Sequence, residues 1–243
     1  MRFLLSLLLL SLTAVGWAQN TPAQQDRWEG MNRRIFAFNE FADKYAIKPV
    51  AKAYKKVTPR FLDDTITRMF QNLNDLRSSI NNVLQWEWYN AGQNFGRFTV
   101  NSTMGVGGMF DVATDIRLKK LPDDLGSTLA VWGVPEGPYL VLPFLGPSTV
   151  RDASAMWPED YLRAYHYIDH DLTRYSVVAV YAIDTRADLL DFESAIVGDR
   201  YSFIRDFYIQ NRRLAAGQAP PEDDFGADMP AGDGWDDEGG DDW

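Results

Sequence analysis

The sequence predicts a mainly α-helical fold, because apolar residues recur every three or four positions over several long stretches. One apolar stripe follows residues 28–45, where Phe36 and Phe41 make it unusually aromatic, and a second follows residues 62–83. Such stripes are typical of amphipathic helices. No run of alternating apolar and polar residues, as a half-buried strand requires, competes with them.

Helices are therefore expected over residues 28–45, 62–83, 88–98, 172–187 and 189–214. Pro49 favours a further helix directly after the first, since proline suits the first turn of a helix. Asp63 and Asp64 are favourable near the N-terminus of the helix over 62–83, where the helix dipole is positive.

One apolar segment, residues 129–150, departs from this pattern, although its single charge, Glu136, leaves it as apolar as a membrane span. Its four prolines would remove too many backbone donors for a lipid-exposed helix. We expect an irregular segment that packs against protein or lines a cavity. It acts as a hinge or gate, or it is a buried connection between helices. The hinge candidates are Gly137, Pro138, Tyr139, Leu142, Pro143 and Gly146.

Residues 1–18 have the parts of a secretory signal peptide: the charge of Arg2, an apolar run, and small residues at Gly16 and Ala18. We expect cleavage before Gln19. An apolar helix of the folded core is the alternative. The sequence has no cysteine, so we expect neither disulfides nor a lipid on a cysteine at the mature N-terminus.

The net charge of −10 belongs to the C-terminal tail, because residues 222–243 hold ten acidic residues and no basic one. The other 24 acidic residues balance the 24 Lys and Arg, which argues against a basic nucleic-acid-binding face. Residues 218–243 are predicted to be disordered. This tail solubilises the protein or recruits a partner through aromatic residues such as Trp235 and Trp243. Residues 19–217 suffice for one helical domain.

Residues 102–113 form an apolar, glycine-rich stretch that is too short to cross a bilayer. As a helix this stretch would measure about 18 Å, whereas a hydrocarbon core of about 30 Å needs about 20 residues. One leaflet of a membrane is therefore within its reach. The candidates for embedding in that leaflet are Met104, Val106, Met109 and Phe110.

Two further groups of residues suit a membrane interface. Trp86, Trp88 and Tyr89 have the amphipathic rings that collect there, although aromatic clusters also form cores. Basic residues over 44–60 are spaced mainly three or four apart, so they bind anionic headgroups or form a solvated helix face. The headgroup or partner candidates are Lys48, Lys52, Lys55 and Lys56.

Signatures of enzymes are missing from the sequence. It has no Gly-x-Ser-x-Gly nucleophile elbow and no phosphate-binding loop of the Walker type. His166 and His170 are the only histidines, four residues apart, and they lack the glutamate of a zinc-protease motif. They could share a helix face as a metal pair, but a surface or packing role fits them better. We therefore expect no catalytic residue, no metal and no cofactor.

Several ordered motifs are spread over about 190 residues, from Trp28 to Gly217. They read D-x-W-E-x-x-N-R-x-x-F-x-F-N from Asp26, P-V-A from Pro49, G-R-F-x-x-N-S-T-x-G-x-G-G-x-F-D-V-A from Gly96, G-x-T-L-x-x-W-G-V from Gly126 with G-P-Y-x-x-L-P-x-x-G from Gly137, and T-R-A-x-L-L-D from Thr185. In these motifs the sequence resembles the MlaA (VacJ) family, outer-membrane lipoproteins of the retrograde phospholipid transport system of Gram-negative bacteria.

The resemblance implies a ring-like helical domain embedded in the inner leaflet of the outer membrane, at its periplasmic face, with an amphipathic pore. It implies that phospholipids misplaced in the outer leaflet are removed and passed to the periplasmic carrier MlaC, in association with a trimeric porin. The hinge candidates would then border the lipid pathway. The family usually has a lipobox cysteine where this chain has Ala18 and Gln19. A soluble periplasmic binding or scaffold protein, recruiting partners through its acidic tail, is the alternative.

Overall fold

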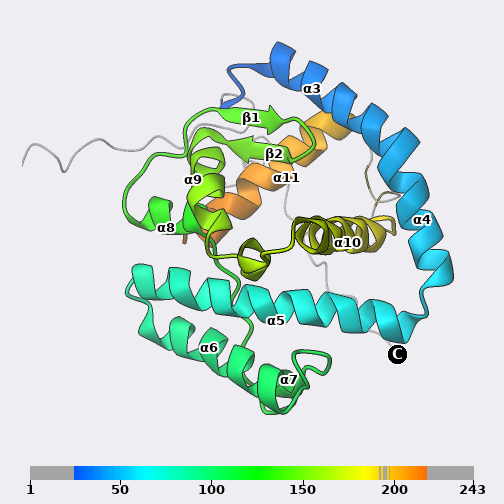
Figure 1. Ribbon diagram of the computed structural model, residues 1–243. Coiled ribbons are helices and arrows are strands. Elements are labelled where there is room, and N and C mark those ends of the chain that lie inside the picture. The colour runs from blue at the N-terminus through cyan, green and yellow to red at the C-terminus, as the bar shows by residue number, and fades with distance from the viewer. Residues whose placement is uncertain (1–24, 192, 194–195, 197, 218–243) are drawn as a thin grey trace, which may run out of the picture. The chain divides into compact units, whose positions relative to one another are not determined.

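Helices dominate the part of the chain that the structure describes, as the apolar periodicity predicts (Figure 1). The computed structural model describes residues 25–191, 193, 196 and 198–217, all within one compact unit. The predicted signal peptide (residues 1–18), the expected new N-terminus at Gln19 and the acidic tail (residues 218–243) lie outside the described residues.

The first half of the chain forms long helices. They are α3 (Glu29–Ala42), the π-helix η1 (Asp43–Ile47), α4 (Lys48–Val57), α5 (Arg60–Leu84) and α6 (Trp88–Thr103). The first three follow one another without a break, and Pro49 lies in the first turn of α4, as expected. The predicted helices over 62–83 and 88–98 are confirmed as α5 and α6.

The second half alternates short helices with a β-hairpin. Its elements are α7 (Val112–Asp115), α8 (Leu125–Val131), β1 (Tyr139–Leu142), β2 (Gly146–Thr149), α9 (Val150–Asp160), the 3-10 helix η2 (Ala164–Tyr167), α10 (Asp171–Leu189) and α11 (Arg200–Ala215). Asp111, Asp124 and Thr149 cap the N-termini of α7, α8 and α9, each accepting a hydrogen bond from a backbone N–H of the first turn.

Two predictions about local structure are wrong. The segment 129–150 is not irregular: it contains the end of α8, both strands and the start of α9. Residues 189–214 are not one helix, because α10 ends at Leu189 and α11 begins only at Arg200, after Gly198 with a φ of 82°. The stretch 102–113 contains the end of α6 at Thr103, a turn and the start of α7.

The two strands pair antiparallel, from Tyr139 opposite Thr149 to Leu142 opposite Gly146. Two asparagines of α3 take the place of a third strand along β1. The side-chain amide of Asn32 donates to the Tyr139 carbonyl (3.1 Å) and accepts from the Val141 N–H (2.9 Å). Asn39, two turns later, does the same for the Leu142 carbonyl (2.9 Å) and the Phe144 N–H (2.8 Å). The hairpin is thus fixed to α3 by the backbone groups that an open edge would expose.

A small apolar cluster forms between the hairpin and α11. Its buried members are Tyr139, Val141, Tyr201 and Ile209, and Ile35, Phe36 and Tyr208 pack against them. These residues come from α3, β1 and α11, elements far apart in the sequence. The cluster therefore holds the hairpin on both flanks, with α3 on one side and α11 on the other.

Candidate functional site

Helix α5 has the reverse of the polarity expected for a helix of a water-soluble protein. The residues that it buries are all polar: Thr65, Asn72, Asp75, Ser78, Ser79, Asn81 and Asn82. Large apolar side chains of the same helix are exposed: Phe61, Leu62, Met69, Leu73, Val83 and Leu84. Surface helices in water normally place the apolar stripe inward. The stripe that predicted α5 therefore faces outward.

Polar side chains also make the contact between α5 and α6, which lie side by side (Figure 1). Asn94 of α6 donates to the Asn82 side chain of α5 (2.8 Å), and Asn72 donates to the Ser102 hydroxyl (2.9 Å). Ser79 donates to the Ala91 carbonyl (3.1 Å). Buried polar groups are stable only when they are hydrogen-bonded, and these three bonds each join one helix to the other.

Arg97 of α6 is the centre of this polar interior, with 3% of its side chain exposed. Its guanidinium donates to Asp75 of α5 (3.1 Å) and to both carboxylate oxygens of Asp111 (2.9 and 3.0 Å). It also donates to the Thr114 hydroxyl (3.0 Å). Burial would raise the pKa of Asp111, but hydrogen bonds from Thr114, Asn101 and Arg97 outweigh burial and lower it to about 2. One buried cation thus joins α5, α6 and the cap of α7.

The turn between α6 and α7 packs its glycines against this interior. A Cβ at Gly105 would lie 2.2 Å from the Phe110 carbonyl oxygen, and one at Gly108, whose φ is +90°, would lie 2.7 Å from the Asn72 Cβ. Only glycine fits such approaches. The apolar side chains of the turn point the other way: Met104, Val106 and Phe110 are 68%, 60% and 47% exposed.

The four predicted leaflet residues therefore divide into two groups. Met104, Val106 and Phe110 lie on the outer surface, whereas Met109 is half-buried. Trp86, Trp88 and Tyr89, at the opposite end of the α5–α6 pair, are exposed as well and so do not form a core. Apolar residues thus cover the outside of the α5–α6 pair at both ends.

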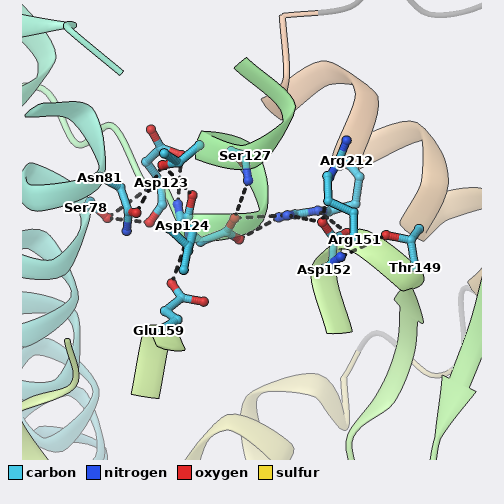
Figure 2. A network of polar contacts seen from close by, with 12 residues as sticks. Ser78, Asn81, Asp123, Asp124, Ser127, Thr149, Arg151, Asp152, Glu159 and Arg212 are labelled. Carbon is cyan, nitrogen blue, oxygen red and sulfur yellow. Dashed lines mark hydrogen bonds and ion pairs between the residues drawn. The ribbon is translucent and has the colours of Figure 1, made fainter. Parts of the chain in front are cut away.

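A second polar network connects α5 with α8, α9 and α11 (Figure 2). The guanidinium of Arg212 donates to both carboxylate oxygens of Asp124 (2.5 and 2.9 Å) and to those of Asp152 (2.9 Å each). Burial would raise the pKa of Asp124, but Arg212 outweighs it and lowers that pKa.

Asp123, one residue earlier, faces α5 instead. Its carboxylate accepts from Asn82 (2.7 Å) and Gln85 (2.6 Å), and Ser78 bonds its backbone. Since these partners are neutral, burial dominates and raises its pKa to about 6.

The hinge candidates lie on the β-hairpin and its flanks. Gly137 and Gly146 have φ values of +72° and +83°, which favour glycine, and a Cβ at Gly137 would lie 3.0 Å from Val150. The turn between the strands is exposed, with Phe144 and Leu145 each 68% accessible. Of the candidates, Pro143 is exposed, Gly137, Pro138, Leu142 and Gly146 are half-buried, and Tyr139 is fully buried in the apolar cluster.

The lysine candidates have different surroundings. Lys48 forms an ion pair with Glu193, and Lys55 forms one with Asp191 at 2.6 Å. Lys52 faces a pocket beside α4, and Lys56 is exposed outside it. Sequence reasoning grouped all four lysines because their spacing places them on one helix. Their ion pairs with Asp191 and Glu193, and their positions relative to the pocket, become visible only in the structure.

The two histidines do not share a helix face. His166 lies in η2 and contacts the Asp160 carboxylate (Nδ1 to Oδ2, 3.0 Å), whereas His170 precedes α10 as its N-cap. Within the described residues, no group of three or more metal-ligating side chains comes together. Nor is any helix of that part of the chain long and apolar enough to cross a membrane.

Comparison with known proteins identifies the family of this chain. The family model described as "MlaA lipoprotein" matches residues 24–215. The chain belongs to the MlaA lipoprotein family. It is 32% identical over 235 residues to the intermembrane phospholipid transport system lipoprotein MlaA of Escherichia coli, which covers 92% of this chain and 93% of that protein. An uncharacterised protein of Rickettsia bellii is 34% identical over 78% of this chain and 76% of its own.

A solved structure resembles the fold with a TM-score of 0.69 and 31% sequence identity, covering 79% of this chain and 98% of the other. It was reported under "Structural basis for maintenance of bacterial outer membrane lipid asymmetry". Many residues of the motifs that resemble the MlaA family are the buried polar residues described above. Asn32 and Asn39 hold the hairpin, and Arg97, Asn101 and Asp111 form the interior of the α5–α7 region.

Sequence reasoning missed the role of these residues, and it also missed Asp124, Asp152 and Arg212. A signal was present for some of them. Asn32 and Asn39 are seven residues apart, and so are Asn94 and Asn101, which puts each pair on one face of its helix. The polar stripe on α5 was equally visible beside the apolar one.

Proposed function

We propose that this chain removes mislocalised phospholipids from the outer leaflet of the outer membrane through an amphipathic pore and passes them to a periplasmic carrier. It thereby maintains the lipid asymmetry of the outer membrane. The proposed location is the inner leaflet, at the periplasmic face, in a ring-like domain formed by residues 19–217. In this proposal residues 1–18 direct export, and residues 218–243 are the acidic tail. The family acts in transport, so no catalytic residue is expected.

The observation that carries this proposal is the reversed polarity of α5. A 25-residue helix is about 37 Å long, and exposing its apolar stripe to water would be unfavourable at about 25 cal/mol for each Å². In the hydrocarbon of a membrane the same stripe would not carry this cost. The polar face of α5 is buried against α6 and Asp123, so the helix can present an apolar exterior without exposing these polar groups to lipid. An ordinary water-soluble scaffold protein would have the opposite arrangement.

The depth of insertion follows from the same surface. No described helix is suited to cross a bilayer, yet apolar residues cover both ends of the α5–α6 pair, at Trp86 and Trp88 and at Met104 and Phe110. An element of this kind fits one leaflet, with Trp86 and Trp88 at an interface. The chain has no cysteine, so retention would depend on these apolar surfaces and on protein partners, a trimeric porin and the carrier MlaC.

The test is complementation. Cells that lack their own homologue expose phospholipid in the outer leaflet, and expression of the full chain should restore the barrier. The mature protein should remain with outer membranes after a carbonate wash. Recovery in the soluble periplasmic fraction, with no restoration, would favour the scaffold alternative over transport.

The hairpin variants Gly146→Val, Pro143→Ala and Leu142→Glu refine this test. Space around Gly146 is open, so only its φ of +83° opposes valine. If the hairpin borders the lipid pathway, these variants should lower lipid passage at equal protein level. If all three restore the barrier like the parent, the hairpin is a packed connection.

A further inference from the structure

A pocket of about 680 Å³ lies where α3, the π-helix η1 and α4 meet α11. Its lining includes Lys44, Lys48, Lys52 and Arg200, and the rings of Phe41 and Tyr45 form the adjoining wall. Their ring centroids are 4.7 Å apart, and the two residues are 62% and 64% exposed. The pocket thus combines positive charge with exposed aromatic surface.

The positive charge of this pocket is only partly neutralised by protein. Four cations face two carboxylates, Glu40 and Asp43. Both nitrogens of the Arg186 fork bind Asp43 (2.7 Å each), and Arg200 lies 3.5 Å from Glu40.

The lysines of the lining differ in the partners that they have. Lys48 binds Glu193. Among the described residues, neither Lys44 nor Lys52 has a carboxylate within ion-pair distance. Two ammonium groups are therefore available to an anionic ligand.

The sequence spacing explains why charge and rings lie side by side. Glu40, Lys44, Lys48 and Lys52 recur every four residues, and Phe41, Tyr45 and Pro49 form the neighbouring row. Residues four apart share a helix face. The π-helical turn Asp43–Ile47 lies at the centre of both rows. Such turns are rare and frequently mark functional sites.

We propose that this pocket binds the phosphodiester group of a glycerophospholipid, a step that rests on the proposed lipid transport. Lys44 and Lys52 supply the charge for the phosphate, and Phe41 and Tyr45 pack against the glycerol and the first acyl carbons. Long lysine side chains suit this role, since they keep the ammonium in a polar layer while the stem covers apolar surface. A free inorganic anion would make use of the lysines but not of the rings.

The binding test uses the full chain in a maltoside detergent and two probes, dihexanoyl-phosphatidylglycerol below its micelle concentration and inorganic phosphate. Binding is followed by ³¹P NMR. The double variant Lys44→Gln with Lys52→Gln should bind the lipid about thirtyfold more weakly, because each basic residue contributes about 1 kcal/mol at an anionic lipid surface. The matched control, Arg34→Gln with Lys119→Gln, loses the same charge at exposed positions outside the pocket and should bind like the parent. Replacing Lys44 and Lys52 by arginine should retain binding.

Two results would overturn the inference: equal lipid affinity in the pocket variant and the control, or inorganic phosphate binding as tightly as the lipid. Phe41→Ser separates the two parts of the site, since it should weaken lipid binding and leave the weak phosphate signal unchanged. Complementation of the deletion strain by the parent chain is scored separately. Its failure would contradict the proposed transport, whereas loss of the lysine effect with intact complementation would contradict only this pocket.

Discussion

The α5–α6 pair and the hairpin cluster solve the problem of a stable interior in opposite ways. Between α5 and α6 the buried contacts are made by Asn, Ser, Asp and Arg side chains, and the apolar residues face outward. Around the hairpin, Tyr139, Val141, Tyr201 and Ile209 form an ordinary apolar core. One chain of 243 residues therefore contains two kinds of interior, one polar and one apolar.

The difference is the one that the proposed membrane location of the α5–α6 pair requires. An apolar core is stabilised by the hydrophobic effect, which requires that the protein be surrounded by water. A polar core is stabilised by its hydrogen bonds, which become more valuable when the surroundings are apolar and water cannot replace them. The hairpin cluster therefore suits an aqueous neighbourhood, and the α5–α6 pair suits lipid. The following single substitutions test this contrast, from the largest expected change in folding stability to the smallest, and a paired test at two adjacent residues of α5 comes last.

Arg97→Met should have the largest effect. It leaves Asp75, which is 2% exposed, without its cation, and it removes both bonds to Asp111. Breaking a buried ion pair by removing one partner costs about 3–5 kcal/mol. Urea unfolding in detergent measures the loss, with Arg60→Met, at an exposed position of α5, as the control. A loss under about 1 kcal/mol, the usual value of an exposed ion pair, would mean that water reaches this interior.

Ile209→Ala should cost about 2–5 kcal/mol, since it removes most of a fully buried side chain from the apolar cluster. Phe207→Ala, two residues earlier in α11 at a position that is 61% exposed, is the matched control and should change little. The same denaturation experiment compares them. If the two variants lose equal stability, the hairpin cluster is not the apolar core of this region.

Asp123→Asn should change the pH dependence of stability by about 1 kcal/mol, after allowance for partial solvent screening. Burial raises the pKa of Asp123 from 3.8 to about 6. The contribution of this carboxyl group to folding stability is therefore fully present below pH 3.8, and it is lost as the pH rises through 6. The melting temperature of the parent should therefore fall relative to the variant between pH 4 and pH 7.

Asp124→Asn provides the opposite sign at the next residue. Burial alone would raise the pKa of Asp124, but Arg212 lowers it below 3.8. Its stabilisation is present above pH 3.8 and is lost as the pH falls further. The melting temperature of the parent should therefore fall relative to the Asp124→Asn variant as the pH falls below 4, and no such fall would mean that Arg212 does not stabilise the charged form of Asp124.

Much of the helical architecture could be predicted from the sequence, because long periodic stripes such as those of α5 and α6 determine secondary structure locally. The hairpin could not. Its strands are four residues each, too short for a period of two to be distinguished, and Pro147 lies within β2 opposite Val141. Its stability comes from Asn32 and Asn39, more than a hundred residues earlier in the chain.

Periodicity also does not determine which face of a helix is buried. It separates the apolar stripe of α5 from its polar stripe, but the choice of the buried one depends on what surrounds the helix. The family resemblance supplied that context, and the burial of Asn72, Asp75 and Asn82 agrees with it. The roles of the site residues on the hairpin and on α4 remain predictions. Their contacts could not be predicted from the sequence, because they form only in the folded chain.

Two adjacent residues of α5 test the contrast as a matched pair. Leu73 is 39% exposed and Asn72 is 3% exposed, so the pair marks the two sides of the helix. Leu73→Asn should alter unfolding in detergent by no more than about 0.5 kcal/mol, as at other surface positions. It should nevertheless reduce the fraction of protein retained on carbonate-washed membranes, because an amide is poorly accommodated in hydrocarbon.

Asn72→Leu should do the reverse, because the leucine would leave the Ser102 hydroxyl unpaired and crowd Gly108, which packs against the Cβ of Asn72. It should destabilise the fold by about 1–3 kcal/mol and leave the membrane-facing surface intact. If α5 were an ordinary helix of a water-soluble protein, Leu73 would be buried and its replacement would destabilise the fold. If Leu73→Asn unfolds the protein and Asn72→Leu does not, α5 buries its apolar side and the lipid-facing interpretation of the helix pair is wrong.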